Sequence, residues 1–234
     1  MNHKFVLIFI VLACLLTGCN FNAPSVNATV VPSALPSLEF VQPTPFVPAS
    51  PTSLPTTIPY SPTTTPLSAQ QEVLKQAADV IKALKDKDMA SLSAYIHPEM
   101  GLRFSPYAYV KDTDQVFPPE KVAGLMTDTT VYTWGVYDGS GEPIDLSFPD
   151  YYAKFVYDVG FADAPQVALN HRLGVGNSID NSIEFYPGSM IVEYYFPGFD
   201  AQYAGMDWRS LLLVFSEYNS TWVLVGIIHD QWTI

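Results

Sequence analysis

The residues whose types best suit acid–base chemistry are the neighbours His229 and Asp230, near the C-terminal end of the sequence. An imidazole titrates near neutral pH, and a carboxylate can orient it or accept its proton. The surrounding run is rich in β-branched and aromatic residues and predicts a strand, whose neighbouring side chains point to opposite faces. The hairpin expected below sets Asp230 opposite Arg209 and His229 opposite Ser210. We therefore expect a structural Arg209–Asp230 ion pair, with catalysis by His229 or Asp230 as the alternative.

A second candidate is Glu193, which stands in an apolar run on the same strand face as Ile191 and Tyr195. A carboxylate at such a position must be paired or lie at an edge. Arg103 is a candidate partner, and Arg103, Glu193 and Tyr195 together would suit an acidic or polar ligand. Nothing in the sequence brings Arg103 close to Glu193, so these three are candidate ligand-binding residues only.

The remaining histidines indicate structural roles. His97 precedes Pro98 and is expected at the C-terminal end of a helix, where the helix dipole favours a positive charge. His171 and Arg172 lie among Gly and Asn residues and are expected in a solvated loop. These histidines lack the close spacing of a zinc site, so we expect no metal and no cofactor.

One acidic stretch resembles a cation-binding loop only in part. Asp138–Glu142 reads Asp-Gly-Ser-Gly-Glu, and Asp145 follows. Carboxylate oxygens could bind calcium, but the full loop pattern is missing, so an ordinary glycine turn is favoured.

Composition limits the classes of partner. The chain has 234 residues and a formal charge of −12, from 11 Lys and Arg against 23 Asp and Glu. A nucleic-acid partner needs clustered basic residues, so we expect none. The 14 Tyr, 14 Phe and 4 Trp indicate a folded domain rather than a disordered chain.

The N-terminal residues predict export. Lys4 precedes an apolar run from Phe5 to Leu16, which is too short to span a membrane and suits a signal peptide. The next residues, Leu16-Thr17-Gly18-Cys19, resemble the lipobox of bacterial lipoproteins. The resemblance implies that residues 1–18 are removed and that Cys19 is acylated, for example with palmitate. The protein would then be anchored by lipid to the cell membrane, on its extracytoplasmic face, without a free thiol. The alternative is a secreted protein with a chance cysteine.

Residues 19–67 are expected to form a disordered linker that begins at the lipidated Cys19. Residues 20–67 include 11 Pro, 14 Ser or Thr and a single charged residue, Glu39. Proline-rich segments of this kind favour an extended, solvated chain.

Residues 68–234 are expected to form one α+β domain. Ser68 and Gln71 match a capping box, and Leu74, Ala77, Ile81 and Leu84 repeat with helical spacing. A helix of about 17 residues is therefore expected. Shorter helices are expected after Asp88, from Pro118 to Met126, and from Phe148 to Tyr157 after the cap Ser147.

The last third of the sequence predicts an antiparallel sheet. The expected strands are Ser189–Phe196, Arg209–Tyr218 and Thr221–Ile234, with a further candidate at Thr130–Tyr137. A two-residue turn at Asn219-Ser220 would pair Phe215 with Leu224 and Leu211 with Ile228. Both faces of the last strand are apolar, so it must be covered on both sides or meet a partner, such as a second copy of the chain.

The helical half carries a family resemblance. The stretch from Ile81 to Pro98, with Asp-Lys-Asp-Met-Ala-Ser-Leu and a closing His97-Pro98, resembles the nuclear-transport-factor-like proteins. The resemblance implies a cone-shaped α+β fold, which ketosteroid isomerases and polyketide cyclases share. In that fold an Asp or His on a strand facing the cone can act as a general base.

Two functions follow as expectations. The first is a non-catalytic domain, displayed by a lipoprotein, that binds a ligand or protein through an aromatic-rich concavity or a sheet face. The alternative is a small isomerase or cyclase that uses a pocket carboxylate or His. An enzyme needs titratable groups that converge in a pocket, whereas a binding domain needs only aromatic rings and hydrogen-bonding groups there.

Overall fold

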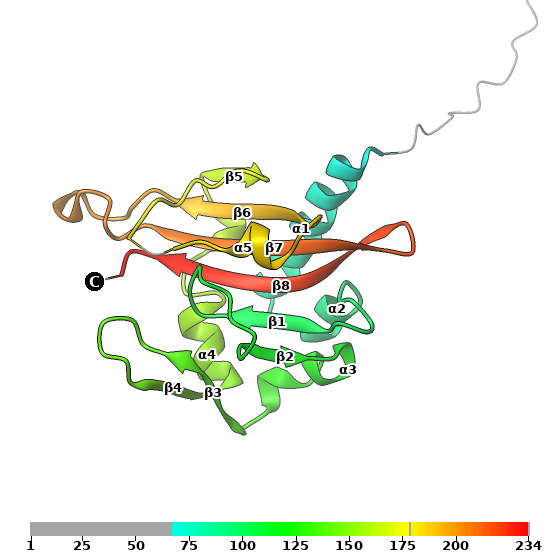
Figure 1. Ribbon diagram of the computed structural model, residues 1–234, viewed down its shortest axis with the longest axis horizontal. Helices are drawn as coiled ribbons and strands as arrows, with labels where there is room; N and C mark the ends of the chain where they lie inside the picture. Colours follow the sequence, from blue (N-terminus) through cyan, green and yellow to red (C-terminus); the bar gives the residue numbers. More distant parts are fainter. Residues whose placement is uncertain (1–66, 178, 234) are drawn as a thin grey trace, which may run out of the picture. The chain divides into compact units, whose positions relative to one another are not determined.

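The computed structural model describes residues 67–177 and 179–233 (Figure 1). The predicted signal peptide, Cys19 and nearly all of the predicted linker lie outside these residues. The helices and strands are α1 (Ala69–Lys85), α2 (Met89–Ser93), β1 (Leu102–Ser105), β2 (Gln115–Phe117), α3 (Pro119–Val122), η1 (Leu125–Thr127), β3 (Val131–Val136), β4 (Pro143–Ser147), α4 (Phe148–Phe155), η2 (Phe161–Asp163), β5 (Gln166–Leu169), α5 (Ser182–Phe185), β6 (Met190–Phe196), η3 (Ala201–Tyr203), β7 (Arg209–Tyr218) and β8 (Thr221–Gln231).

The helices and strands together form an α+β fold, as the sequence predicts. One sheet has six strands in the order β2-β1-β8-β7-β6-β5, and β3 and β4 form a separate two-stranded sheet. Neighbours in the large sheet are antiparallel except β1 and β8, which are parallel. Within the described part of the chain, no helix has the length and apolar character that a membrane span requires.

The first two helices begin where the sequence predicts. Ser68 accepts a hydrogen bond from the Gln71 N–H, and the Gln71 side chain accepts one from the Ser68 N–H, which completes the capping box. The buried side of α1 packs against β6 and β8. Asp88 caps α2 by accepting from the Ser91 N–H.

Two later helices are shorter than expected. The helix predicted from Pro118 to Met126 ends at Val122, and Met126 lies in the separate turn η1. Ser147 caps α4 as predicted, but α4 ends at Phe155, and Val156 leaves the helical region with φ −123°.

The hairpin of β7 and β8 begins in the predicted register. Asn219 and Ser220 have φ values of 50° and 63°, as a type I′ turn requires, and Phe215 pairs with Leu224. A bulge follows, because Val214 pairs with Gly226 and one residue of β8 is left over.

The bulge changes every pair beyond it. Leu211 pairs with His229 rather than Ile228, and Ser210 rather than Arg209 lies opposite Asp230. The predicted pairs Leu211–Ile228, Arg209–Asp230 and Ser210–His229 are therefore wrong.

The two faces of the large sheet are covered differently. Its inner face packs on α1, α2 and α4 around a core that contains Leu211, Leu213 and Ile227. In this core Trp134 and Tyr151 are fully buried and stack with ring centroids 3.8 Å apart.

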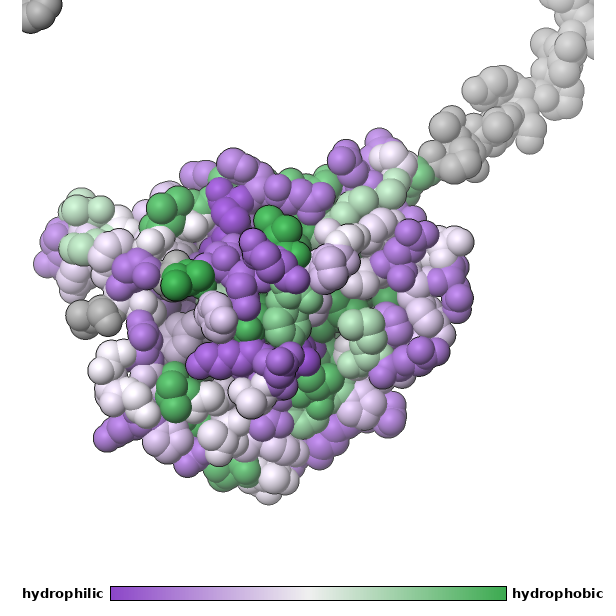
Figure 2. Space-filling model, in the orientation of Figure 1, coloured by the Kyte–Doolittle hydropathy of each residue, from purple (hydrophilic) through white to green (hydrophobic). Residues whose placement is uncertain are grey.

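The outer face carries a second apolar cluster that includes Tyr186, Leu212 and Ile228. Phe185 at the end of α5 and the following Tyr186 pack on this cluster, and α5 lies in front of the sheet in Figure 1. As a result, residues 224–230 of β8 are buried by this chain on both sides. Figure 2 shows this side of the molecule as a mixture of hydrophilic and hydrophobic residues.

Candidate functional site

One cavity, which we call the tyrosine cavity, has a volume of about 600 Å³. It lies between the loop after β1, the turn between β3 and β4, and the C-terminal segment. Its lining residues are Pro106, Tyr107, Tyr109, Lys111, Asp114, Gly135, Val136, Tyr137, Asp138, Gly139, Gly141, Asn177, Ile179 and Thr233.

The buried carboxylate in this lining, that of Asp114, already accepts hydrogen bonds from its own chain. Asp114 accepts hydrogen bonds from the Ser105 Oγ at 2.6 Å and from the Lys111 N–H at 2.9 Å. Burial raises the pKa of Asp114, and these hydrogen bonds partly oppose the rise. Asp114 therefore holds the loop of the cavity to β1.

Arg103 supports the same loop from β1. Its Nη1 donates to the carbonyl oxygens of Lys111 at 2.9 Å and Asp114 at 3.0 Å, and its guanidinium lies 5.1 Å from the Phe185 ring centroid. The candidate pairing of Arg103 with Glu193 is therefore wrong, since Arg103 holds a loop and Glu193 has another partner.

Two tyrosine hydroxyls at the cavity already accept a hydrogen bond. The Tyr107 hydroxyl accepts from the Asp138 N–H at 3.3 Å, and the Tyr137 hydroxyl accepts from the Lys154 Nζ at 3.2 Å. Burial raises the pKa of Tyr107, so its phenol stays protonated at neutral pH. Each hydroxyl thus keeps its own proton for donation. Tyr109 is 49% exposed and presents an open ring.

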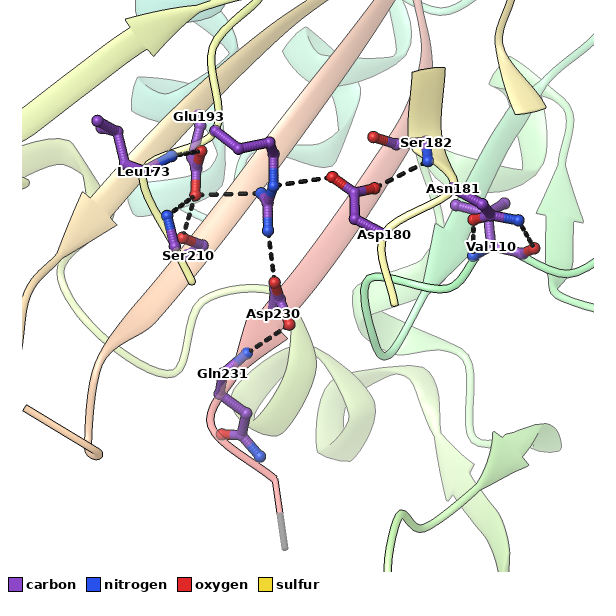
Figure 3. A network of polar contacts seen from close by, with 11 residues as sticks. Val110, Leu173, Asp180, Asn181, Ser182, Glu193, Ser210, Asp230 and Gln231 are labelled. Carbon is purple, nitrogen blue, oxygen red and sulfur yellow. Dashed lines mark hydrogen bonds and ion pairs between the residues drawn. The ribbon is translucent and has the colours of Figure 1, made fainter. Parts of the chain in front are cut away.

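A second cluster lies on the outer face, where Arg172 pairs with Asp180, Glu193 and Asp230; Figure 3 labels these three carboxylate residues. The Arg172 Nε lies 2.9 Å from Asp180, its Nη1 3.1 Å from Glu193, and its Nη2 2.5 Å from Asp230. The expectation of a solvated loop at His171 and Arg172 is therefore wrong for Arg172, whose side chain is 22% exposed, whereas His171 is exposed.

Glu193 is the most buried member of the Arg172 cluster, at 1% exposure. It accepts from the N–H groups of Leu173 at 2.6 Å and Gly174 at 2.9 Å, and from the Ser210 Oγ at 2.5 Å. Of the two predicted alternatives, a paired carboxylate or one at a sheet edge, the structure has the first, with Arg172 as the partner and β6 inside the sheet. Together these bonds attach the segment after β5 to the outer face.

The Arg172 cluster adjoins a smaller cavity of about 250 Å³. Arg172 and Glu193 line it, with His171, Ser182, Ile183 and Tyr186 among the other lining residues. The carboxylate oxygens here are engaged: those of Asp180 contact Arg172 and the Ser182 N–H, and those of Asp230 contact Arg172 and the Gln231 N–H. Asp180 and Asp230 stand outside the lining of this cavity, whereas the Ser182 hydroxyl in the lining is buried without a hydrogen-bond partner among the described residues.

His229 lies on the opposite face of the sheet from Asp230, as strand alternation predicts. It is fully buried, and its Nε2 lies 3.3 Å from the Asp158 Oδ1. Arg209 also pairs with Asp158, with its Nε 3.0 Å from Oδ2. Burial alone would raise the pKa of Asp158, but the neighbouring His229 and the Arg209 guanidinium hold it below its usual value.

The other candidates have structural roles. His97 lies beyond α2, and its Nδ1 accepts from the N–H groups of Glu99 at 3.1 Å and Met100 at 3.0 Å, so it closes a turn rather than ending the helix. Tyr195 packs with its ring centroid 6.0 Å from that of Trp208.

The acidic turn between β3 and β4 has the glycine conformations of an ordinary turn, with positive φ at Gly139 and Gly141. Asp145 accepts from the Thr133 hydroxyl at 2.6 Å. Across residues 67–177 and 179–233, no three His, Cys, Asp or Glu side chains are grouped so that they could hold a metal ion.

Sequence reasoning missed the residues of the tyrosine cavity. Tyr107 and Tyr109 follow Pro106 and alternate along the chain, and Tyr137 precedes the glycine-rich turn. Alternating tyrosines beside a Pro and a Gly turn were the available signal, but such residues are also common in cores.

The described residues form a small α+β domain with the tyrosine cavity, a smaller cavity beside the Arg172 cluster, and polar clusters on opposite sheet faces. No protein-family model matches the sequence, and no curated protein matches it. Sixteen solved chains match the structure.

A Xanthomonas campestris protein described as a calcium/calmodulin dependent protein kinase II association domain is 13% identical, with a TM-score of 0.30, over 70% of this chain and 86% of its own. A chain named Rd1NTF2_05, which carries five substitutions, is 10% identical, with a TM-score of 0.28, over 69% of this chain and 99% of its own. A DUF4783 family protein from Bacteroides ovatus is 13% identical, with a TM-score of 0.25, over 66% and 93%. At these TM-scores the likenesses carry no argument about the site.

Proposed function

We propose that this protein is a bacterial lipoprotein, anchored through Cys19 on the extracytoplasmic face of a membrane, whose domain binds a ligand without catalysing a reaction. We assign the domain to a variant of the nuclear-transport-factor-like cone fold. The ligand site in this proposal is the tyrosine cavity.

The observation that carries the proposal is the chemistry of the cavity lining. Tyr107, Tyr109 and Tyr137 supply rings and hydroxyls, while the buried carboxylate Asp114 is held by the chain itself. A catalytic pocket would need titratable groups that converge on a bound molecule and are free to exchange protons. A binding pocket needs aromatic surface with a few hydrogen-bonding groups, which this cavity has.

The alternative function is that of a small enzyme that uses His229 with Asp158. The 3.3 Å approach of these two buried groups favours it. Against it, neither residue lines the tyrosine cavity or the smaller cavity. His229 packs instead against Phe155, with ring centroids 5.7 Å apart.

Amide hydrogen exchange can distinguish the two functions. The mature chain is mixed with the peptide and small-molecule fraction of a bacterial envelope. We expect amide exchange to become slower in residues 106–111 and 135–141. Slower exchange confined to residues 155–158 and 228–230 would support the enzyme instead. Tyr109→Ala should abolish the expected protection, whereas Tyr203→Ala, at a similarly exposed tyrosine outside the cavity, should not.

A further inference from the structure

The hydrogen-bonding groups of the tyrosine cavity are mainly donors. Tyr107 and Tyr137 each accept a bond from the chain and keep a proton to donate, and Lys111 adds an ammonium group. Asn177 contributes little, because its amide is bonded to Thr233. The exposed Asp138 carboxylate also lines the cavity and can accept, so a matching ligand would present several oxygen acceptors and fewer N–H or O–H donors.

The walls between these donors are apolar or lack side chains. Val136 is 44% and Ile179 73% exposed, and Pro106 adds a flat ring. Gly141, at φ 70°, has no atom within 4 Å of the place where a Cβ would stand, so a ligand backbone can approach it closely.

The charges disfavour an anionic ligand. The chain has a formal charge of −12, and Asp138 stands exposed among the lining residues beside a single lining cation, Lys111. The charge of the whole chain would repel an anion, and the ammonium group of Lys111 in the lining would repel a cation, so an uncharged ligand fits best.

From these three observations we infer that the tyrosine cavity binds an uncharged, proline-rich peptide segment in its extended form. Polyproline II exposes its carbonyl oxygens, and proline has no N–H to donate, so such a peptide matches a lining of donors. Aromatic-lined grooves bind these segments, because their conformation is largely formed before binding. An oligosaccharide fits less well, since each of its many hydroxyls also needs an acceptor and the exposed carboxylate in the lining is that of Asp138. This inference rests on the proposed binding function and specifies its ligand.

Calorimetry on the soluble mature chain tests the inference. The probe is a short synthetic oligoproline with blocked ends, and the matched probe has alanine in place of every second proline. We expect the proline peptide to bind and the alanine peptide to bind much more weakly. Tyr109→Ala should weaken binding about tenfold, the cost of losing one well-placed aromatic contact, and Tyr107→Phe should weaken it several-fold.

Tyr203→Ala is the matched control, because Tyr203 is 48% exposed against 49% for Tyr109 and does not line the cavity. Equal affinity for both peptides, or undiminished binding by Tyr109→Ala, would overturn the inference. Binding of an uncharged linear glucan without binding of the peptide would also overturn it, while the proposed binding function would stand. If neither probe binds, the peptide inference fails, and hydrogen exchange with the envelope fraction still tests the binding function.

Discussion

Arg172 and Glu193 join a loop to the sheet it covers, with the Arg172 Nη1 3.1 Å from the Glu193 Oε1. The side chain of Glu193 is 1% exposed, and the same guanidinium also reaches Asp180 and Asp230. One cation therefore compensates three carboxylates, two of them almost fully buried, and holds the segment after β5 against the outer face.

Arg172→Ala should strongly destabilise the domain, because it leaves Glu193 and Asp230 buried without their cation. Breaking a buried ion pair from one side costs about 3–5 kcal/mol. Urea unfolding followed by circular dichroism measures the loss. Asp180→Asn neutralises a more exposed partner of Arg172, so it should reduce the free energy of unfolding by less. This variant should still fold even if Arg172→Ala does not.

Lys82→Ala is the control for that experiment. Lys82 pairs with Asp86 on the exposed side of α1, where solvent screens the charges, and its removal should leave the unfolding midpoint unchanged. Similar effects of the Arg172 and Lys82 substitutions would contradict a structural role for the Arg172 cluster.

Acid should weaken the contacts that Asp158 makes with His229 and with Arg209. Burial opposes ionisation of Asp158, but His229 and Arg209 hold its pKa in the folded protein below the usual 3.8. Its contribution to stability is therefore complete above the pKa of the unfolded chain and is lost as pH falls through the folded value. In urea titrations, the stability difference between wild type and Asp158→Asn should shrink below about pH 4. A difference that stays constant down to pH 2 would show that the charge of Asp158 does not stabilise the fold.

Ser220→Gly should stabilise the β7–β8 hairpin. Ser220 has φ 63°, a conformation that costs a residue with a Cβ but not glycine. We expect a gain of about 0.5–1 kcal/mol in unfolding free energy, measured by thermal and urea denaturation. Ser220→Ala keeps the Cβ and should bring no such gain. A loss of stability in Ser220→Gly would contradict the type I′ turn.

The sequence predicts the local features of this fold well, because their signals lie within a few residues. The capping box at Ser68, the cap at Asp88 and the turn at Asn219 each depend on neighbouring side chains. The strands β1, β2 and β5 were missed because each is four residues or shorter and carries little apolar pattern.

The position of the β8 bulge depends on tertiary contacts, although Gly226 is a sequence signal for it. A Cβ on Gly226 would lie 2.9 Å from the Tyr186 hydroxyl and 3.3 Å from the Val214 Cβ, so a larger residue there would force the Tyr186 side chain to shift. Glycine inside a strand often accompanies a bulge, and that signal would have moved Asp230 away from Arg209. No local pattern pairs Arg172 with Glu193, because a loop distant in sequence brings the cation.

Cys19→Ala tests the anchor. If Cys19 is acylated, cells that express the full chain should incorporate labelled palmitate into the wild type but not into the variant, and the variant should leave the membrane fraction. Two or more acyl chains suffice for stable anchoring, so the shift should be nearly complete. Cys14→Ala is the control, since Cys14 lies within the predicted signal peptide. Membrane retention of Cys19→Ala would reject the lipoprotein.

The central claim is that the tyrosine cavity, rather than the buried His229–Asp158 pair, is where this domain meets its ligand. Heteronuclear NMR of the mature chain, titrated with a library of small uncharged fragments, tests this residue by residue. We expect chemical-shift changes to cluster at Tyr107, Tyr109 and Tyr137 and to disappear in Tyr109→Ala. Shifts that cluster at His229 and Asp158, and persist in Tyr109→Ala, would contradict it.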